Sequence, residues 1–220
     1  MGPHRIPTDT DLFSLPTGLP EPRDDRAARH LAGAVIPSLL LRSTRGRWVN
    51  VAEAAQHLSV FFFYPATVKP GIPIPGEWSE VPGARGCTLQ NCGFRDEYSR
   101  FQAAGCTVWG VSGQGQEPSE GLEEQIEFSR RVGLPFELLN DSGFELVHAL
   151  SLPTFVVSLR SPTVEFEGKR YEFPLQGRTV IKRLTFVADR GRIEKVFYPV
   201  FPPHRNAAAV LEFLRSRATG

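Results

Sequence analysis

The most continuous hydrophobic segment of the chain is LSVFFFYPA, which begins at Leu58. An unbroken apolar run, as opposed to one that alternates with polar residues, is typical of a strand buried on both faces of its sheet. CTVWGVS at residues 106–112 has the same character and predicts a second buried strand. Between them, residues 87–104 have the pattern of an amphipathic helix, which Gly105 is expected to close as a C-terminal cap.

The remaining patterns continue this alternation of strands and helices. Asn206 stands where a helix N-cap is preferred, and Gly168 with Lys169 is predicted to form a hairpin turn. We expect further strands at residues 34–43, 48–51, 135–141, 152–159, 180–189 and 192–198, and helices at 51–56, 119–133, 144–150 and 207–217. The pattern predicts an α/β fold with a mixed central sheet flanked by helices on both faces, and it resembles a thioredoxin-like fold.

Two proline-rich segments lie outside these elements. Residues 1–34 have little periodicity and are expected to form an extended N-terminal arm beside a single domain at residues 35–217. Residues 66–86 are dense in proline and glycine, so neither helix nor strand is expected to persist there. Loops of this length inside compact domains are usually functional or disordered.

Composition and charge narrow the function classes. The 220 residues are 41% hydrophobic, which is enough for a substantial core. Lysine and arginine total 25 against 24 acidic residues, without a long run of either sign, so we expect no nucleic-acid and no membrane partner. The segment MGPHRIPTDT lacks the apolar core of a secretion signal. We therefore expect a cytoplasmic protein, where a close cysteine pair is more often catalytic, sensing or metal-binding than structural.

Cys87 and Cys92 stand five positions apart at the start of the helix predicted for residues 87–104. On a helical wheel Cys87 shares an apolar stripe with Phe94, which predicts that it faces the core, whereas Cys92 is predicted to face solvent. An intact helix would hold the two Cα atoms about 8 to 9 Å apart, beyond the roughly 7 Å that a disulfide allows. A bond between them would require the first turns to unwind, so a permanent disulfide is disfavoured.

The position of Cys87 favours a reactive thiolate. Free N–H groups and the helix dipole stabilise negative charge in the first turn, and Arg85 and Arg95 are close in sequence. A zinc site is disfavoured, because its cysteines usually lie two to four residues apart and the five histidines here are scattered singly. We therefore expect neither a metal nor a cofactor.

Several segments together resemble a known pattern. FFFYP at residues 61–65 and GCTLQNCGFRD at residues 86–96 are similar to the active-site segment of peroxiredoxins, in particular of the PrxQ type, also called bacterioferritin comigratory protein. Further matches are GCTVWGVS, LPFELLND and KRLTFVADRGRIEKVF, at residues 105–112, 134–141 and 182–197. The resemblance covers roughly residues 35–217, and its cysteine segment is specific.

This resemblance implies a thiol-dependent peroxidase that reduces hydrogen peroxide or organic hydroperoxides. Cys87 would match the peroxidatic cysteine, which attacks the peroxide and becomes a sulfenic acid. Cys92 would match the resolving cysteine, which forms an intrachain disulfide with Cys87 that an external dithiol such as thioredoxin reduces. Arg183, in the strand predicted at residues 180–189, would stabilise the thiolate and orient the peroxide. PrxQ relatives are often monomers, so a monomer is expected.

The segment before Cys87 departs from the family pattern Pro-x-x-x-Thr-x-x-Cys. Ala84 stands where the threonine is expected and Glu80 stands where the proline is expected. Either Pro65 and Thr67 are the displaced first half of the motif, folded back into the substrate pocket, or the hydroxyl is missing. A missing hydroxyl keeps open an alternative function as a redox sensor with little turnover, and an inert thioredoxin-like binding module is the third class.

The third cysteine and the tryptophans have simpler interpretations. Cys106 begins a predicted buried strand, where a free cysteine commonly acts as a small hydrophobic residue. Trp48, Trp78 and Trp109 are expected to be packing residues and not substrate platforms. Trp78 lies in the loop before Cys87, which suggests as a hypothesis that it walls the peroxide pocket.

Overall fold

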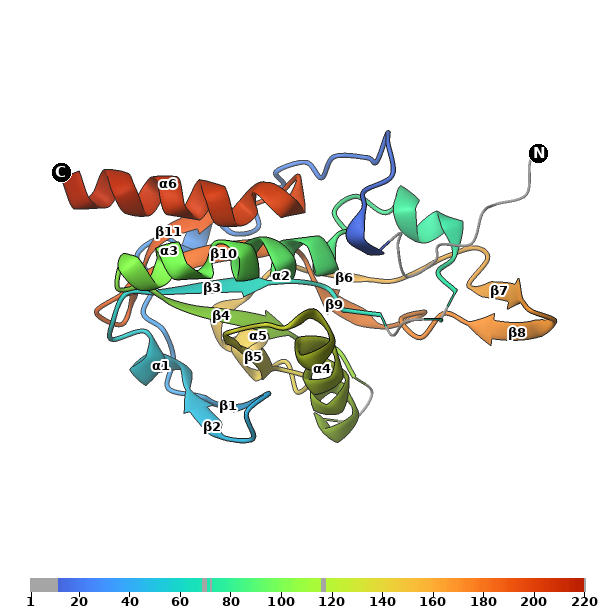
Figure 1. Ribbon diagram of the computed structural model, residues 1–220, viewed down its shortest axis with the longest axis horizontal. Coiled ribbons are helices and arrows are strands. Elements are labelled where there is room, and N and C mark those ends of the chain that lie inside the picture. Colours follow the sequence, from blue (N-terminus) through green and yellow to red (C-terminus); the bar gives the residue numbers. More distant parts are fainter. Residues whose placement is uncertain (1–11, 69–70, 72, 116–117, 220) are drawn as a thin grey trace.

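The computed structural model of the protein describes residues 12–68, 71, 73–115 and 118–219. Their largest unit is a seven-stranded sheet with the order β11-β10-β3-β4-β5-β1-β2 (Figure 1). The strands are β1 Leu40–Ser43, β2 Trp48–Asn50, β3 Ser59–Phe63, β4 Thr107–Ser112, β5 Glu137–Asn140, β10 Leu184–Asp189 and β11 Arg192–Phe197. Strands β3, β4 and β5 run parallel and the other pairs are antiparallel, which confirms the predicted mixed sheet.

Helices cover both faces of this sheet. They are α1 Val51–Ala54, α2 Cys87–Asp96, α3 Tyr98–Ala103, α4 Pro118–Val132, α5 Glu145–Leu150 and α6 Asn206–Thr219, with short 3-10 helices η2 Arg29–Leu31, η3 Gly76–Glu80 and η4 Pro203–Arg205. Figure 1 shows α2 and α3 lying beside α6 on one side of the strands. Helices α2, α4 and α6 contribute to one hydrophobic cluster against the sheet, and α1 and α5 contribute to the other. Among the described residues, no helix is both long enough and apolar enough to cross a membrane.

Strand β3 separates the two main hydrophobic clusters. Phe61 and Phe63 point into one cluster, which also contains residues of α1 and α5. Val60 and Phe62 point into the other, between the sheet and helices α2, α4 and α6. Phe62 stacks on Phe94 of α2 with ring centroids 4.3 Å apart. All five residues of β3 are buried, so the prediction from its unbroken apolar run is confirmed.

Three predicted elements differ in detail. The helix expected at residues 87–104 breaks at Glu97, whose φ of −96° and ψ of 4° separate α2 from α3. The strand expected at residues 180–189 divides into β9 Thr179–Ile181 and β10, because β9 pairs with β6 Thr154–Val156 while β10 pairs with β3. The hairpin of β7 Thr163–Phe166 and β8 Lys169–Glu172 turns at Glu167 and Gly168, since Lys169 already pairs with Phe166.

The described part of the loop at residues 66–86 packs against side chains of residues 155–180, the part of the chain from β6 to β9. It contains η3, a short 3-10 helix that the sequence pattern did not predict. Trp78 in η3 lies 6.3 Å from Phe155 and 5.1 Å from Phe173, measured between ring centroids. These residues belong to a third hydrophobic cluster, separate from the two beside β3. The loop is therefore held in place by apolar burial close to α2.

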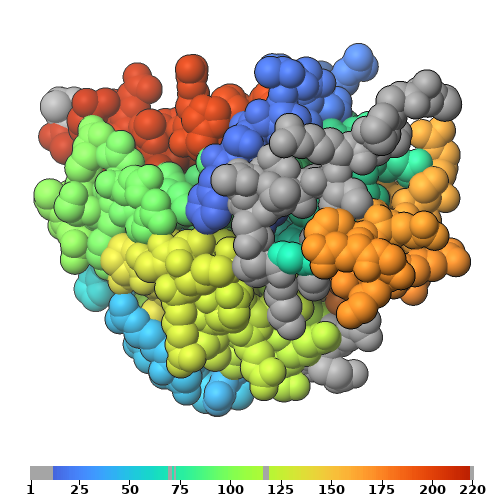
Figure 2. Space-filling model, turned by 45° about the vertical axis from the view of Figure 1, so that its right-hand side comes forward, coloured from blue at the N-terminus to red at the C-terminus, as the bar shows by residue number. Residues whose placement is uncertain are grey.

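The N-terminal arm, as far as it is described, lies on the domain. Leu31 is fully buried in the cluster that contains Phe61. Asp25 accepts hydrogen bonds from Lys182 Nζ at 2.6 Å and from the Tyr198 hydroxyl at 2.8 Å. Figure 2 shows the arm in blue, lying against the body of the molecule beside the red C-terminal helix.

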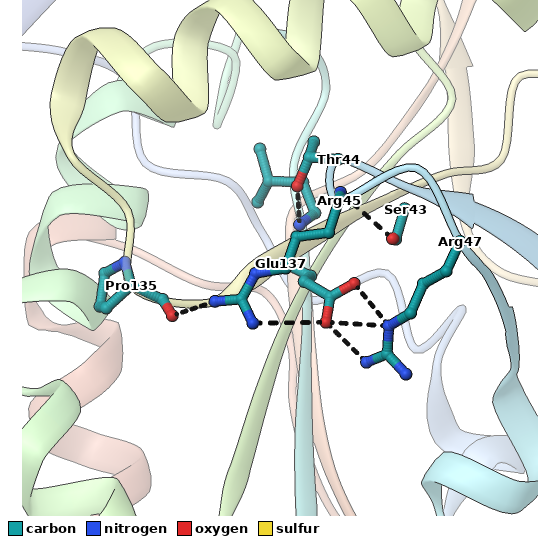
Figure 3. A network of polar contacts seen from close by, with 7 residues as sticks. Ser43, Thr44, Arg45, Arg47, Pro135 and Glu137 are labelled. Carbon is teal, nitrogen blue, oxygen red and sulfur yellow. Dashed lines mark hydrogen bonds and ion pairs between the residues drawn. The ribbon is translucent and has the colours of Figure 1, made fainter.

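The β1–β2 turn is attached to β5 by a buried carboxylate. Arg47 Nη2 lies 2.6 Å from Glu137 Oε1, and Arg45 donates to the carbonyl of Pro135 at 2.9 Å (Figure 3). Burial alone would raise the pKa of Glu137, but the hydrogen bonds from Arg47 and the charge of Arg45 outweigh it and lower the pKa. The network fixes the edge of the sheet, far in sequence from Cys87.

Candidate active site

Cys87 is the first residue of α2, as predicted from the sequence. Gly86 before it has φ of +95°, a conformation that L side chains rarely adopt. A Cβ atom on Gly86 would also overlap Pro203 of η4 and lie 3.2 Å from Leu15 of the arm. The helix therefore begins at a sharp turn that only glycine fits, and its free N–H groups lie next to the sulfur of Cys87.

A small cavity lies beside Cys87. Its volume is about 30 Å³, more than the roughly 10 to 15 Å³ that a cavity needs to hold one water molecule. The arm, the loop before α2 and the first turn of α2 all contribute to its wall, which contains Leu12, Ser14, Ala66, Thr67, Val68, Ile74, Trp78, Ala84, Arg85, Gly86, Cys87 and Thr88. The hypothesis that Trp78 walls a pocket at Cys87 agrees with this lining. A molecule the size of hydrogen peroxide fits the cavity as it stands.

Arg183 is the basic residue in contact with Cys87. Its Nη2 atom lies 3.3 Å from Cys87 Sγ and also donates to the carbonyl oxygens of Gly83, Ala84 and Arg85 at 3.3, 3.4 and 3.1 Å. The prediction that Arg183 lies in a strand is wrong, because it falls in the short connection where the chain passes from β9 to β10. A buried guanidinium at this distance stabilises a thiolate by charge and hydrogen bonding.

A chain of buried polar groups extends from Arg183 to helix α6. Arg183 Nη1 donates to Gln90 Oε1 at 2.5 Å, and Gln90 Nε2 donates to Asn206 Oδ1 at 3.0 Å. Thr185 Oγ1 donates to the same Asn206 oxygen at 2.7 Å. Asn206 was predicted to be a helix N-cap, but its φ of −60° and ψ of −47° are helical and its side chain faces Gln90 and Thr185. Its role is to join α6 to α2 and β10.

Cys92 is buried, with only 6% of its surface exposed, so the prediction that it faces solvent is wrong. Helix α2 packs on more than one side, and Cys92 belongs to the same cluster as Phe128 and Val132 of α4. Burial raises the pKa of the Cys92 thiol, although the positive charge of Arg95 acts in the opposite direction. Both cysteines are free and lie in one continuous helix, as the helical spacing predicted.

The two arginines expected to act on Cys87 are separated by the fold. Arg85 is buried and lines the cavity beside Cys87. Arg95 instead lies toward Cys92, where it pairs with Asp96 and donates to the carbonyl of Val132 at 2.7 Å. Of these two arginines, Arg85 therefore stands at the cavity, whereas Arg183 contacts the sulfur without being part of the lining.

The segment from Pro65 to Thr67 returns to the site. Thr67 lines the cavity, and its hydroxyl and backbone N–H both donate to Gln114 Oε1, at 3.1 and 3.0 Å. The Pro65 carbonyl accepts a hydrogen bond from Ser112 at 3.0 Å, so both ends of the segment are held by residues at the end of β4. Ala84 also lines the cavity and presents its carbonyl 3.8 Å from Cys87 Sγ. Thr67 thus stands in the wall of the same cavity as Cys87, where it was placed as a pocket candidate.

Cys106, Trp48 and Trp109 are not among the residues that line the cavity beside Cys87. Cys106 is buried beside β4, and burial raises its pKa to about 12. Trp109 is buried as expected, whereas Trp48 is 58% exposed, with Arg42 stacked 5.1 Å above its ring. Trp48 lies on β2, which is an edge strand, so its outer edge has no neighbouring strand in the described sheet.

Several residues of the site were not predicted from the sequence. They are Leu12, Ile74, Gln90, Gln114, Thr185 and Asn206. Gln90 did carry a signal, since it lies three positions after Cys87 and four before Phe94, on the face predicted to be buried. A polar residue on a buried face must find a partner, and here the partners are Arg183 and Asn206.

Comparison with known proteins identifies the family. The AhpC/TSA family model matches residues 81–196, just over half of the 220 residues. The chain belongs to the AhpC/TSA family. Peroxiredoxin Q, chloroplastic, of Gentiana triflora is 28% identical over 211 residues, covering 93% of this chain and 78% of the relative. Peroxiredoxin Q, chloroplastic, of Oryza sativa subsp. japonica is 28% identical over 185 residues, covering 84% of this chain and 66% of the relative.

Solved structures of AhpC/TSA proteins have the same fold. Peroxiredoxin Q of Xanthomonas campestris matches with a TM-score of 0.57 and 22% identity, over 84% of this chain and 98% of that chain. Peroxidoxin BcpB of Mycobacterium tuberculosis matches with a TM-score of 0.57 and 21% identity, over 84% and 96%. The predicted thioredoxin-like fold and the predicted peroxiredoxin family are therefore confirmed, and peroxiredoxins are thiol peroxidases.

Proposed function

We propose that Cys87 is the peroxidatic cysteine of a thiol peroxidase that reduces hydrogen peroxide or organic hydroperoxides. The observation that supports this most directly is the 3.3 Å contact between Arg183 Nη2 and Cys87 Sγ, at a helix N-terminus and beside a cavity of peroxide size. These features favour a thiolate and leave space for its substrate. In this proposal Arg183 holds the thiolate, and Thr67 in the cavity wall, with Pro65 of the same segment, is the candidate to hold the peroxide.

In the first step, the Cys87 thiolate attacks one oxygen of the peroxide. The O–O bond breaks, an S–O bond forms, and Cys87 becomes a sulfenic acid while the other oxygen, once protonated, leaves as water or an alcohol. The sulfur is oxidised and the peroxide is reduced by the same two electrons. The Arg183 guanidinium stabilises the negative charge that moves from sulfur to the leaving oxygen.

In the second step, the Cys92 thiol condenses with the Cys87 sulfenic acid, forming an S–S bond and releasing water. Five residues of α-helix keep the two Cα atoms about 8 to 9 Å apart, so α2 must unwind locally before the sulfurs meet. Burial of Cys92 supports the same conclusion, since its side chain lies in a hydrophobic cluster while α2 is folded. The disulfide then exchanges with an external dithiol, for which thioredoxin is the candidate, and both thiols are restored.

The partner and location follow from this cycle. A dithiol reductant is available in a reducing compartment such as the cytoplasm, which is where we place the protein. We propose that the monomer is the working unit, because each step uses groups of one chain. No step of the proposed cycle requires a nucleic acid, a membrane, a metal or a cofactor.

Ala84 supports a second candidate function. Its methyl group stands at the family's threonine position, so no hydroxyl is supplied there. A protein that oxidises and reduces the same cysteine pair slowly would act as a peroxide sensor instead of a peroxidase. Thr67 argues for the peroxidase, because it places a hydroxyl in the wall of the same cavity.

One set of measurements separates these candidates. Peroxide removal is followed with thioredoxin and its reductase for the wild type, Cys87→Ser and Cys92→Ser. A peroxidase predicts sustained turnover by the wild type, none by Cys87→Ser, and a single turnover without an intrachain disulfide for Cys92→Ser. A sensor predicts the same disulfide in the wild type with little turnover. Full peroxide removal by Cys87→Ser would contradict both candidates.

A further inference from the structure

We propose that Asn206 is a positioning residue that holds the Arg183–Cys87 contact together and keeps α2 folded. The inference rests on the proposed function, in which α2 must be folded for the peroxide step and unwound for disulfide formation. Asn206 is not among the residues that line the cavity beside Cys87. It acts on them through Gln90, whose side chain lies between Asn206 and Arg183.

The hydrogen bonds fix the orientation of Gln90. Asn206 Oδ1 accepts from both Gln90 Nε2 and Thr185 Oγ1, at 3.0 and 2.7 Å. A side-chain amide that donates on one side presents its carbonyl oxygen on the other, and that oxygen accepts from Arg183 Nη1 at 2.5 Å. A reversed Gln90 amide would place N–H groups against a guanidinium, which has no acceptor. The oxygen of Asn206 thus determines which atom of Gln90 meets Arg183.

Burial makes this arrangement costly to disturb. Gln90 and Thr185 are fully buried, Asn206 is 4% exposed and Arg183 is 3% exposed. A buried polar group that loses its partner keeps the full desolvation penalty, so Gln90 would turn or shift if the Asn206 oxygen were removed. Arg183 would then lose the acceptor of its Nη1 atom, and its guanidinium would be held at Cys87 only by the bonds that Nη2 makes to backbone carbonyls.

The same bonds distinguish folded from unwound α2. Gln90 lies between Cys87 and Cys92, in the turns that must open for the disulfide to form. Asn206 and Thr185 lie on α6 and β10, outside those turns. The Asn206–Gln90 bond therefore exists only in the folded form, and a contact made in one form alone shifts the balance toward that form. Gly93 of α2 supports the same docking, since its Cα packs so closely that an added Cβ would lie 3.2 Å from the His204 carbonyl.

Asn206→Leu tests this role, because leucine has a similar size and no acceptor. Stopped-flow kinetics of one turnover gives the peroxide-dependent rate of Cys87 oxidation and the peroxide-independent rate of disulfide formation. We expect the first to fall about tenfold and the second to rise several-fold. Asn206→Asp retains an acceptor oxygen and is expected to recover most of the first rate. A purely structural role would lower the melting temperature and leave both rates of the folded protein unchanged.

A second variant keeps the inference testable if Asn206→Leu does not fold. Thr185→Val removes one donor to Asn206 and is expected to change both rates in the same directions by a smaller factor. Hydrogen exchange of the α2 amides in the reduced protein is expected to be faster in Thr185→Val, with exchange in β4 unchanged. Wild-type values for both rates and for α2 exchange would overturn the inference. Absence of Cys87 oxidation in the wild type would instead contradict the proposed function, and the exchange measurement on reduced protein would still decide the role of Asn206.

Discussion

Lys182 of the β9–β10 connection lies 2.6 Å from Asp25 of the N-terminal arm, measured from Nζ to Oδ2. Lys182 immediately precedes Arg183, whose guanidinium contacts Cys87 Sγ. The short segment that positions the arginine at the active site therefore also anchors the arm, which in turn contributes Leu12 to the cavity wall. The arm and the reactive cysteine are thus connected through two adjacent residues.

The Asp25–Lys182 pair predicts how attachment of the arm depends on pH. The hydrogen bond from Lys182 is the largest cause that lowers the pKa of Asp25 to about 2, from an ordinary value of 3.8. A lowered pKa means that the pair stabilises the arm fully above about pH 4 and that this contribution is lost as the pH falls toward 2. We expect Asp25→Asn to speed hydrogen exchange in residues 19–31 severalfold at pH 6, and the ratio to wild type to approach one near pH 2.

Asp24→Asn is the matched control for that experiment. Asp24 accepts a hydrogen bond from the backbone N–H of Arg26, within the arm. Its substitution removes the same charge without breaking the contact to Lys182. Equal exchange in both variants would show that net charge, and not the pair, attaches the arm.

Arg183 is predicted to be needed for the peroxide step. Arg183→Met removes the group that donates to Cys87 Sγ, and loss of one such donor to a developing charge typically costs about 100-fold in rate. Arg183→Lys keeps the charge but not the forked geometry, so we expect an intermediate loss. Lys195→Met, at an exposed position of β11, is the control for general positive charge. Stopped-flow measurement of Cys87 oxidation checks the series, and a comparable loss in Lys195→Met would refute a specific role for Arg183.

Leu12 is predicted to limit the size of the substrate. It lines the cavity of about 30 Å³ beside Cys87, so Leu12→Ala should enlarge that cavity. We expect the rate constant with cumene hydroperoxide to rise severalfold relative to that with hydrogen peroxide. Neighbouring Phe13 is 47% exposed and is not part of the lining, which makes Phe13→Ala the control. An unchanged ratio of the two substrates in Leu12→Ala would mean that the arm does not restrict access.

Cys106 is predicted to take no part in the cycle. Burial raises its pKa to about 12, so almost no thiolate is present at pH 8. Cys106→Ala should keep wild-type peroxide turnover, and mass spectrometry after treatment of the native protein with iodoacetamide at pH 8 should find Cys106 unmodified. Unfolding in urea should make it reactive, which provides the positive control.

Gly86 is predicted to be among the least replaceable glycines near the site. Gly86→Ala introduces both an unfavourable positive φ and an overlap with Pro203. Gly46 has a similar φ of +81° but open space around it, so Gly46→Ala isolates the conformational cost, about 1 kcal/mol. We expect Gly86→Ala to lower the free energy of unfolding clearly more, by on the order of 3 kcal/mol, because overpacking adds to it. Urea denaturation of both variants measures the difference.

The elements that could be predicted from the sequence are those whose pattern is local. The unbroken apolar runs identified β3 and β4. The helical periodicity after Cys87 correctly placed this residue at the start of α2. The burial of Cys92 could not be predicted in this way, because a wheel with one buried face does not describe a helix that packs on two sides. The cluster that contains Cys92 includes residues of α4 and α6, which both come later in the chain.

The contacts of Arg183 illustrate a second limit. Strand alternation assumes one sheet, but the chain leaves the β6–β9 pair and enters the main sheet at Arg183, so its direction was not determined by its neighbours. Its partners Gly83, Cys87 and Gln90 are distant in sequence and are brought together by tertiary packing. The resemblance to the family identified Arg183 as a candidate residue. Its distances to these partners could be obtained only from the structure.

Burial of Cys92 has a consequence for the partner that restores the thiols. In the reduced protein the Cys92 sulfur is buried in its cluster, so it is not part of the surface that a reductant meets. In the proposed cycle, the Cys87–Cys92 disulfide that forms after a peroxide is consumed holds α2 open and changes that surface. The oxidised and reduced forms of the enzyme would then present different surfaces to the reductant. The reductant could bind the oxidised form selectively, even when most molecules are reduced.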